Sequence, residues 1–284
     1  MGSRYVVLYT FHRANPLSLH RLIRLQRVNP RVTVVPCLGI RQRIYLPALV
    51  DLQPAPAKFF NWAFLRSTHC LKLSRIINEK VESVRRKAEI GVVRDALHRI
   101  SMKLYCDFTP MGYFNQDLAI LNWFSSEGKN LDFDFLVFFE YDMFATKTIE
   151  SLYGKYTHYD AGFVNYHEAH PSWYWYRNPP GAKKSIIGWL KQRNLSPILY
   201  GGLFPGHMVS HEVLTKLEKA RLPYGFCEIR LPSVLTGLGF SCVSLDFPLV
   251  RYGVPLSKSD VEANSGLGLF HPVYDILMGN VRAS

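Results

Sequence analysis

The chain lacks the features that most directly identify a membrane protein. No run of 18 consecutive apolar residues occurs in its 284 residues, so we expect no membrane-spanning helix. The apolar run that begins at Tyr5 is too short for a signal peptide. We therefore expect a cytoplasmic protein, with peripheral association at the cytoplasmic face of a membrane as a further expectation.

Cysteine is scarce and has no pattern. The five cysteines are Cys37, Cys70, Cys106, Cys227 and Cys242. They lie far apart, are odd in number and form no C-x-x-C pair, so neither a zinc site nor a disulfide framework is indicated. Reduced thiols in a reducing compartment are the simpler interpretation. His207 and His211 are four residues apart but lack the glutamate of H-E-x-x-H, which disfavours a zinc pair.

Two nucleotide-binding motifs are also absent. No G-x-G-x-x-G follows the first expected strand, and G-x-x-x-x-G-K-[ST] does not occur. The dinucleotide and P-loop interpretations therefore lose their main support. With 48% hydrophobic residues, the composition is that of a globular domain with a substantial core.

Positive charge is concentrated in two segments. The formal net charge is +12, and residues 72–103 and 177–194 each contribute +5. The first segment reads as an amphipathic helix over about 72–104, facing either solvent or a membrane surface. The second places Ile186 and Trp189 among lysines, which suits either an interfacial anchor or a flap over a phosphate. Both segments favour an anionic partner.

The order of the expected elements predicts an α/β fold. A strand at 4–11, a helix at 19–28 and a strand at 32–36 make a βαβ unit, which implies a parallel sheet. Further strands are expected at 159–164, 198–207 and 241–245. Helices are expected at 146–153, 211–219 and 233–239.

One stretch, residues 132–144, carries most of the functional signal. It is an almost continuous apolar run typical of a strand buried on both faces, and it ends on Glu140 and Asp142. Open α/β sheets bind their ligands at the carboxyl ends of such strands. Residues two apart in extended chain point the same way, so the two acids suit one divalent cation, although a polar turn is the alternative.

Three later features suit a substrate site. Trp173 and Trp175 lie in an aromatic run that can stack on sugars or bases, or act as a hydrophobic staple under a loop. Gly201 and Gly202 permit close approach of a ligand. Glu228 stands at the start of an expected helix, either as a partly desolvated base or as a partner of the helix dipole or of Arg230.

These features occur in a fixed order: a βαβ start, an acid pair that ends a strand, a glutamate that opens a helix, and a late His271-Pro272. In this order they resemble the GT-A glycosyltransferases, with Glu140-Tyr141-Asp142 as a variant of the D-x-D motif. The resemblance implies a single domain with a Rossmann-like, mixed, mostly parallel central sheet flanked by helices. Residues 1–145 would bind the nucleotide sugar, with a helical insertion at about 72–104, and residues 146–284 would bind the acceptor.

The resemblance also implies a set of site residues. Asp142, Glu140 and His271 would hold Mn²⁺ or Mg²⁺, and Glu228 would be the catalytic base. The expected donor-binding residues are Thr10, His12, Arg13, Asp117, Tyr141, Arg251 and Lys258. The expected acceptor-binding residues are Trp173, Trp175, Gly201, Gly202, His207 and Arg230.

The expected activity is metal-dependent transfer of a sugar from a nucleoside diphosphate to a glycan or lipid-linked acceptor. Inversion with Glu228 as base is one mechanism, and retention without that base is the alternative. A non-catalytic protein that binds anionic membranes or nucleic acid stays open as another class. The acid pair argues against nucleic acid as the partner.

Overall fold

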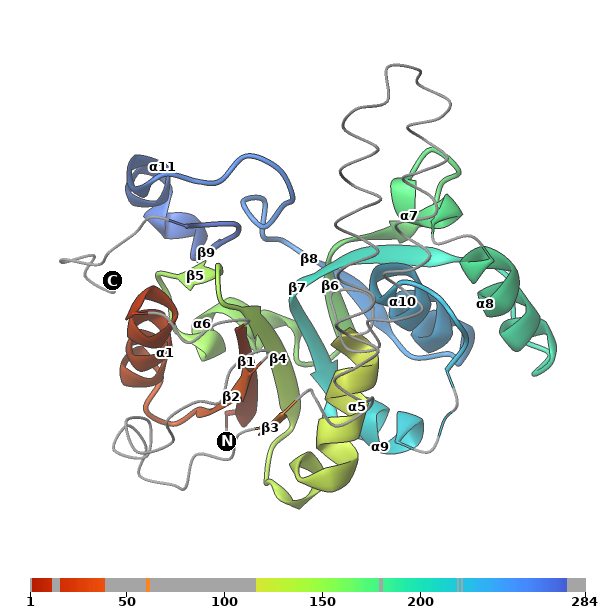
Figure 1. The fold of residues 1–284 in the computed structure, drawn as a ribbon. Coiled ribbons are helices and arrows are strands. Elements are labelled where there is room, and N and C mark those ends of the chain that lie inside the picture. Colours follow the sequence, from red (N-terminus) through yellow and green to blue (C-terminus); the bar gives the residue numbers. More distant parts are fainter. Residues whose placement is uncertain are drawn as a thin grey trace, which may run out of the picture.

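The computed structural model describes residues 2–11, 16–38, 60–61, 116–178, 181–218, 220 and 222–274. Among these residues seven strands form one sheet in the order β3-β2-β1-β4-β7-β6-β8, and β5 and β9 form a small second sheet (Figure 1). The strands are β1 Tyr5–Phe11, β2 Thr33–Leu38, β3 Phe60–Asn61, β4 Phe135–Glu140, β5 Phe144–Ala145, β6 Ala161–Glu168, β7 Tyr200–Ser210, β8 Cys242–Leu245 and β9 Leu269–Phe270. The helices are α1 Pro16–Val28, α5 Gln116–Ser126, α6 Ile149–Tyr153, α7 Tyr174–Arg177, α8 Ala182–Lys191, α9 His211–Leu217, α10 Cys227–Gly237 and α11 Lys258–Ala263.

The main sheet is mixed and mostly parallel. β1 pairs in parallel with β2 and β4, β2 pairs in parallel with β3, and β6 pairs in parallel with β8. Only β7 runs against its neighbours, β4 and β6. All other strands of this sheet therefore end at the same edge. The predicted α/β class, with a mixed, mostly parallel sheet flanked by helices, is confirmed.

The central strand β4 separates two hydrophobic clusters. Leu136 and Phe138 point into a cluster with α5, α8, α9 and α10, whereas Phe135, Val137 and Phe139 point into a cluster with α1 and α6. This alternation follows from the two-residue period of a strand. Because both faces are covered by helices, every position from Phe135 to Phe139 is buried, as the apolar run predicted.

The proposed division of the chain at residue 145 stays a prediction. The helical insertion at about 72–104, with the first basic segment, lies outside the described residues. Within the described part of the chain, no helix combines the length and apolar character needed to cross a membrane.

A buried ion pair joins α5 to α10. Arg230 Nε donates to Asp117 Oδ2 over 2.7 Å, and Arg230 Nη2 contacts the second carboxylate oxygen. The two side chains are at most 2% exposed. Asp117 was predicted to bind the donor and Arg230 the acceptor. Their mutual, fully buried contact makes them a structural clamp instead, because neither side chain can reach a ligand without breaking the pair.

The second basic segment is also corrected in part. Ile186 and Trp189 of α8 are buried in the core cluster that includes α10, so they are not membrane anchors. The lysines of this segment remain exposed; they are Lys183, Lys184 and Lys191. Any attraction of α8 to an anionic surface is therefore electrostatic.

The clamp predicts a large asymmetry in stability. Asp117→Ala leaves the Arg230 guanidinium buried without its counter-charge, and the free energy of unfolding should fall by about 3–5 kcal/mol. The control is Glu212→Ala, which breaks an exposed pair with Lys216 and should cost no more than about 0.5 kcal/mol. Urea unfolding of both variants measures the difference. Equal losses would show that the buried pair is not a clamp.

Candidate functional site

Three side chains meet at the edge where the parallel strands end. β4 ends at Glu140, a turn follows, and Asp142 is the next acid. His271 Nε2 lies 3.4 Å from Glu140 Oε2 and 3.5 Å from Asp142 Oδ1. One ligand atom of each residue lies within 4.8 Å of the others. The structure thus brings the three residues predicted as metal ligands to one point, which we call the triad.

Backbone pairing between distant segments places the histidine there. β5 pairs with β9 immediately before His271, and the Val273 N–H donates to the Asp142 carbonyl oxygen over 2.8 Å. On its other side, the His271 N–H donates to the Leu249 carbonyl at 2.9 Å, and the Arg251 N–H donates to the His271 carbonyl at 3.2 Å. His271 is therefore positioned by main-chain contacts with two separate parts of the chain.

Two buried side chains hold the turn between the two acids by hydrogen bonds to its backbone. The Tyr141 carbonyl oxygen accepts hydrogen bonds from Arg21 Nη1 at 2.9 Å and from the Tyr9 hydroxyl at 3.3 Å. Within the turn, the Met143 N–H donates to the Glu140 carbonyl at 3.0 Å. Arg21 and Tyr9 are buried, so the backbone that carries the acids rests on a fixed polar support.

Within the triad, the protonated His271 lies against two acids. Burial lowers the pKa of His271, but hydrogen bonds and charge attraction from Asp142 and Glu140 outweigh it and raise the pKa to about 10. His271 Nδ1 lies 3.0 Å from the Arg251 carbonyl, which requires a proton on Nδ1 and directs Nε2 toward the acids.

The donor set fits a divalent cation. Asp142 Oδ1 is buried, and His271 Nε2, at 3.5 Å, is too distant to satisfy this oxygen with a strong hydrogen bond. Two carboxylates with one imidazole nitrogen form a set of ligands that Mn²⁺ or Mg²⁺ accepts. A bound cation would take the place of the His271 proton in balancing the acids.

A third acid, Glu228, lies beside the triad. It belongs to the first turn of α10 and is fully buried. Its Oε1 accepts hydrogen bonds from the Phe204 N–H at 2.9 Å and from the Tyr252 hydroxyl at 2.7 Å, whereas the buried Oε2 accepts none. The Tyr252 ring packs edge-on against His271, with centroids 5.7 Å apart. Tyr252 thus links Glu228 to the triad.

The environment of Glu228 makes it a stronger base than an ordinary glutamate. Burial has the largest effect and raises the pKa to about 8, against the lowering effect of its two hydrogen-bond donors. Of the structural roles left open by the sequence, pairing with Arg230 is wrong, because Arg230 pairs with Asp117. Glu228 does occupy a helix N-terminus, where burial has the largest effect on its pKa.

Two predicted donor-binding residues lie next to the triad. Thr10, at the end of β1, is paired with Glu140 in the parallel register, and its hydroxyl donates to the Phe139 carbonyl at 3.2 Å. Tyr141 lies between the two acids and is half-buried, with its pKa raised to about 12 by burial and by Asp142. Its phenol is therefore neutral at ordinary pH.

The other donor candidates are less closely placed. Arg251 has an exposed side chain, while its carbonyl orients His271. Lys258 begins α11 and forms an exposed ion pair with Glu262 at 3.5 Å. His12 and Arg13 lie outside the described residues, so their predicted donor-binding roles stay predictions.

The aromatic acceptor candidates share the edge of the triad, where β6 ends and β7 begins. The Trp173 ring lies so close to Gly201 that a Cβ on residue 201 would be 2.2 Å from it. Trp175 packs on Phe226, the residue that precedes α10, with ring centroids 3.8 Å apart. Trp175 therefore contacts the segment that leads to Glu228, whereas Trp173 packs on β7 at Gly201.

Two acceptor candidates belong to the core. His207 is fully buried among Phe138, Phe163 and Phe204, and burial lowers its pKa to about 3. A neutral, enclosed imidazole cannot contact an acceptor, so this prediction is wrong. Gly202 faces the core too, since a Cβ there would be 2.6 Å from Phe163.

Sequence reasoning missed three supporting residues. Gln116 Nε2 donates to Glu140 Oε1 over 2.6 Å, and Arg21 and Tyr252 contact the turn and Glu228, as described above. Gln116 stands beside Asp117, which was singled out, but no local pattern marks Arg21 or Tyr252. Their contacts arise only from the fold.

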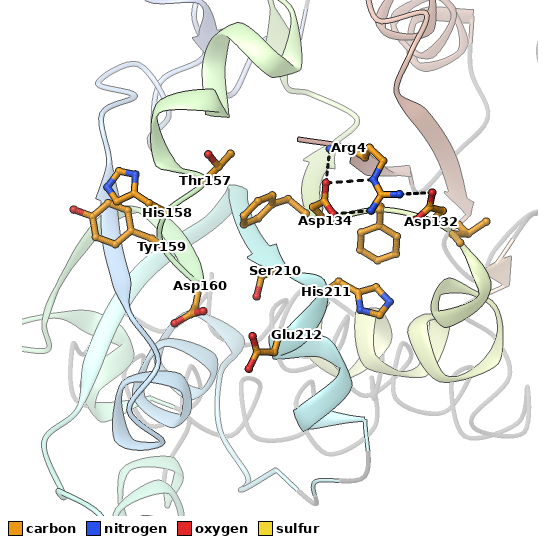
Figure 2. A pocket seen from close by; sticks show the side chains of 13 residues that line it. Arg4, Asp132, Asp134, Thr157, His158, Tyr159, Asp160, Ser210, His211 and Glu212 are labelled. Carbon is orange, nitrogen blue, oxygen red and sulfur yellow. Dashed lines mark hydrogen bonds and ion pairs between the residues drawn. The ribbon is translucent and has the colours of Figure 1, made fainter. Parts of the chain in front are cut away.

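A shallow cavity of about 530 Å³ lies at the opposite edge of the sheet (Figure 2). Its carboxylates already have partners: Arg4 binds both Asp132 and Asp134, and Asp160 accepts from Ser241. The cavity lies at the amino-terminal end of β4, away from the triad. It does not compete with the triad as a catalytic site.

Comparison with known proteins adds one distant likeness. No protein-family model matches the chain, and no curated protein matches its sequence. Among solved structures, the mannosyltransferase Ktr4p from S. cerevisiae aligns at 9% identity, with a TM-score of 0.37, over 76% of this chain. The alignment spans 60% of that structure's chain. At this TM-score neither the fold nor the activity of this chain follows from the likeness.

The raised pKa of Glu228 predicts a pH-dependent stability. Between the ordinary value of 4.5 and about 8, the folded protein holds a proton that the unfolded chain releases. The free energy of unfolding should therefore fall as pH rises through this range. Glu228→Gln removes the titration and should flatten the fall, measured by urea unfolding at pH 5 and pH 8 with a chelator. Glu212→Gln, 65% exposed, is the control and should keep the wild-type slope. The same slope in both variants would contradict the burial argument.

Proposed function

We propose that the protein is a metal-dependent glycosyltransferase that moves a sugar from a nucleoside diphosphate to a hydroxyl of a glycan or lipid-linked acceptor. The observation that carries the proposal is the triad at the carboxyl edge of the sheet, with a third acid, Glu228, beside it whose pKa is raised. An acid with a strongly perturbed pKa beside a charged cluster is typical of catalytic sites. The order of motifs in the sequence supports the same activity.

In this proposal Glu140, Asp142 and His271 hold the divalent cation. When bound, the cation supplies positive charge that offsets the charge on the departing diphosphate. The residues of the chain fix the place of that charge: Gln116 occupies one oxygen of Glu140, and the Arg251 carbonyl orients the imidazole. Such supporting contacts define the direction of each ligand atom.

Glu228 is proposed as the base. As the acceptor oxygen bonds to the anomeric carbon, its proton passes to the Glu228 carboxylate, and the bond from that carbon to the diphosphate oxygen breaks with its electron pair. The reaction inverts the anomeric configuration. A pKa of about 8 makes the ionised carboxylate more basic, while the ionised fraction grows toward pH 8. The Phe204 N–H stabilises the ionised form.

One observation favours the retaining alternative. Glu228 is fully buried, and a retaining enzyme has no need of a base that reaches the acceptor. The anomeric configuration of the product distinguishes the two mechanisms. A non-catalytic binding protein has no use for a cation site next to a perturbed acid.

The acceptor is proposed to carry negative charge. Residues 169–211 contain no Asp or Glu, and their five Lys and Arg side chains are all exposed. This stretch includes the aromatic segment with Trp173 and Trp175, as well as α8. A phosphate-bearing lipid or an anionic glycan matches both the charge and the aromatic surface.

Removal of the Asp142 charge should strongly weaken cation binding. Asp142→Asn keeps the shape of the side chain but removes its charge, so Mn²⁺ affinity should fall by roughly 100-fold or more. Calorimetric titration with Mn²⁺, alone and with a panel of nucleoside diphosphates, measures the loss. Asp132→Asn, whose side chain is 81% exposed at the opposite edge, is the control and should bind normally. Unchanged Mn²⁺ affinity in Asp142→Asn would exclude the triad as the metal site.

Loss of the base should separate transfer from binding. Glu228→Gln should lower the turnover of transfer by about 10²–10⁴-fold, because the proton acceptor is gone, while donor binding persists. Turnover and nucleotide affinity are measured on the same preparation, with the folded fraction determined by thermal unfolding. Near-normal turnover in folded protein, or a product with retained configuration, would exclude Glu228 as the base.

A further inference from the structure

Within the described part of the chain, Tyr252 is the side chain that donates a hydrogen bond to Glu228. Both Tyr252 and the Phe204 N–H donate to the same oxygen, Oε1, and Glu228 has no exposed surface. A base that has to receive a proton from an acceptor needs an open position on its carboxylate. Oε2 has no hydrogen-bond donor but is enclosed, whereas Oε1 meets the partly exposed Tyr252, whose hydroxyl occupies the position on that oxygen.

The two donors differ in how readily they can leave. Phe204 donates from the backbone of β7, in the buried centre of the sheet. Tyr252 lies on the surface segment between β8 and α11, and its side chain is 39% exposed. Gly253, the next residue, has φ +124°, and Val254 is 78% exposed. Outward movement of Tyr252 would break no hydrogen bond between strands, because Tyr252 lies outside the sheet, whereas the Phe204 N–H belongs to β7.

The place of the Tyr252 hydroxyl also suits an acceptor. A phenol and a sugar hydroxyl make the same kind of O–H hydrogen bond to a carboxylate oxygen. The position lies 2.7 Å from Glu228 Oε1, and the Tyr252 ring contacts the His271 ring of the triad. A hydroxyl at this point is next to both the proposed base and the cation ligands.

We propose that the hydroxyl subsite of the acceptor is the position held here by the Tyr252 hydroxyl, and that Tyr252 covers Glu228 until an acceptor hydroxyl replaces it. This inference rests on the proposed function. It accounts for a proposed base that has no exposed surface. After replacement, the acceptor O–H donates to Oε1, and the Phe204 N–H continues to hold the same oxygen.

Chemical labelling tests the cover without requiring activity. A water-soluble carbodiimide with glycinamide couples to accessible carboxyls, and mass spectrometry follows the labelling of Glu228. Tyr252→Ala should be labelled at Glu228 several-fold faster than wild type, and methyl glycosides should slow the labelling by occupying the subsite. Tyr159→Ala, at the opposite edge of the sheet (Figure 2), is the control and should match wild type. Equal rates in wild type and Tyr252→Ala, or no protection by methyl glycosides, would overturn the proposal.

Kinetics test the replacement itself. Tyr252→Phe keeps the ring but removes the competing hydrogen bond, so the KM for a methyl glycoside acceptor should fall about two- to tenfold. Turnover and the KM for the nucleotide sugar are measured in the same assay. A loss of turnover with unchanged acceptor KM would make Tyr252 a positioning residue and end the subsite assignment. If wild type turns over no nucleotide sugar, the proposed function fails, while the labelling rates still decide whether Tyr252 covers Glu228.

Discussion

The pairing of the C-terminal segment with the turn after β4 is the contact on which the candidate site depends. Two acids so close together, one buried and one largely buried, repel each other unless a positive group lies between them. β5 and β9 supply it by placing His271 against both acids, and the Val273 N–H fixes the Asp142 backbone. The site therefore forms only when residues separated by about half of the chain come together, and its charge balance is a property of the tertiary fold.

The third acid of the site, Glu228, depends on a different contact. α10 carries Glu228 in its first turn, and the Asp117–Arg230 clamp ties that same turn to α5. The first turn of α5 also supplies Gln116, which holds Glu140. One pair of helix ends thus sets the position of Glu228 and supports Glu140. The buried ion pair, costly to desolvate, is consistent with a role in fixing this geometry.

The sequence predicted the central strand and its two acids from local pattern, but it did not predict the contact with His271 in that way. The apolar run 132–144 predicted β4, because a strand covered on both faces must be apolar at every position. The edge at which Glu140 and Asp142 lie followed from the parallel order of the strands. That His271 joins the two acids was predicted from the resemblance alone, since no local pattern links residues so far apart.

The errors have a common physical cause. His207, Asp117, Arg230 and Trp189 were given functional or surface roles because polar and aromatic side chains suggest contact with ligands. Each is buried with a partner in the fold: rings around His207, an ion pair for Asp117 and Arg230, and the core for Trp189. Composition alone cannot distinguish a polar group satisfied inside the protein from one that awaits a ligand.

The glutamate at position 140 shows how a departure from the usual acid can serve the same geometry. Its two oxygens have separate tasks, because Oε1 accepts from Gln116 while Oε2 faces His271. The shorter side chain of Asp142, held by its backbone, leaves Oδ1 without a hydrogen bond. The longer acid thus needs a side-chain support to fix its extra torsion, whereas the shorter one is fixed by the turn itself. This division explains why a glutamine from α5 belongs to a site otherwise built from strand ends.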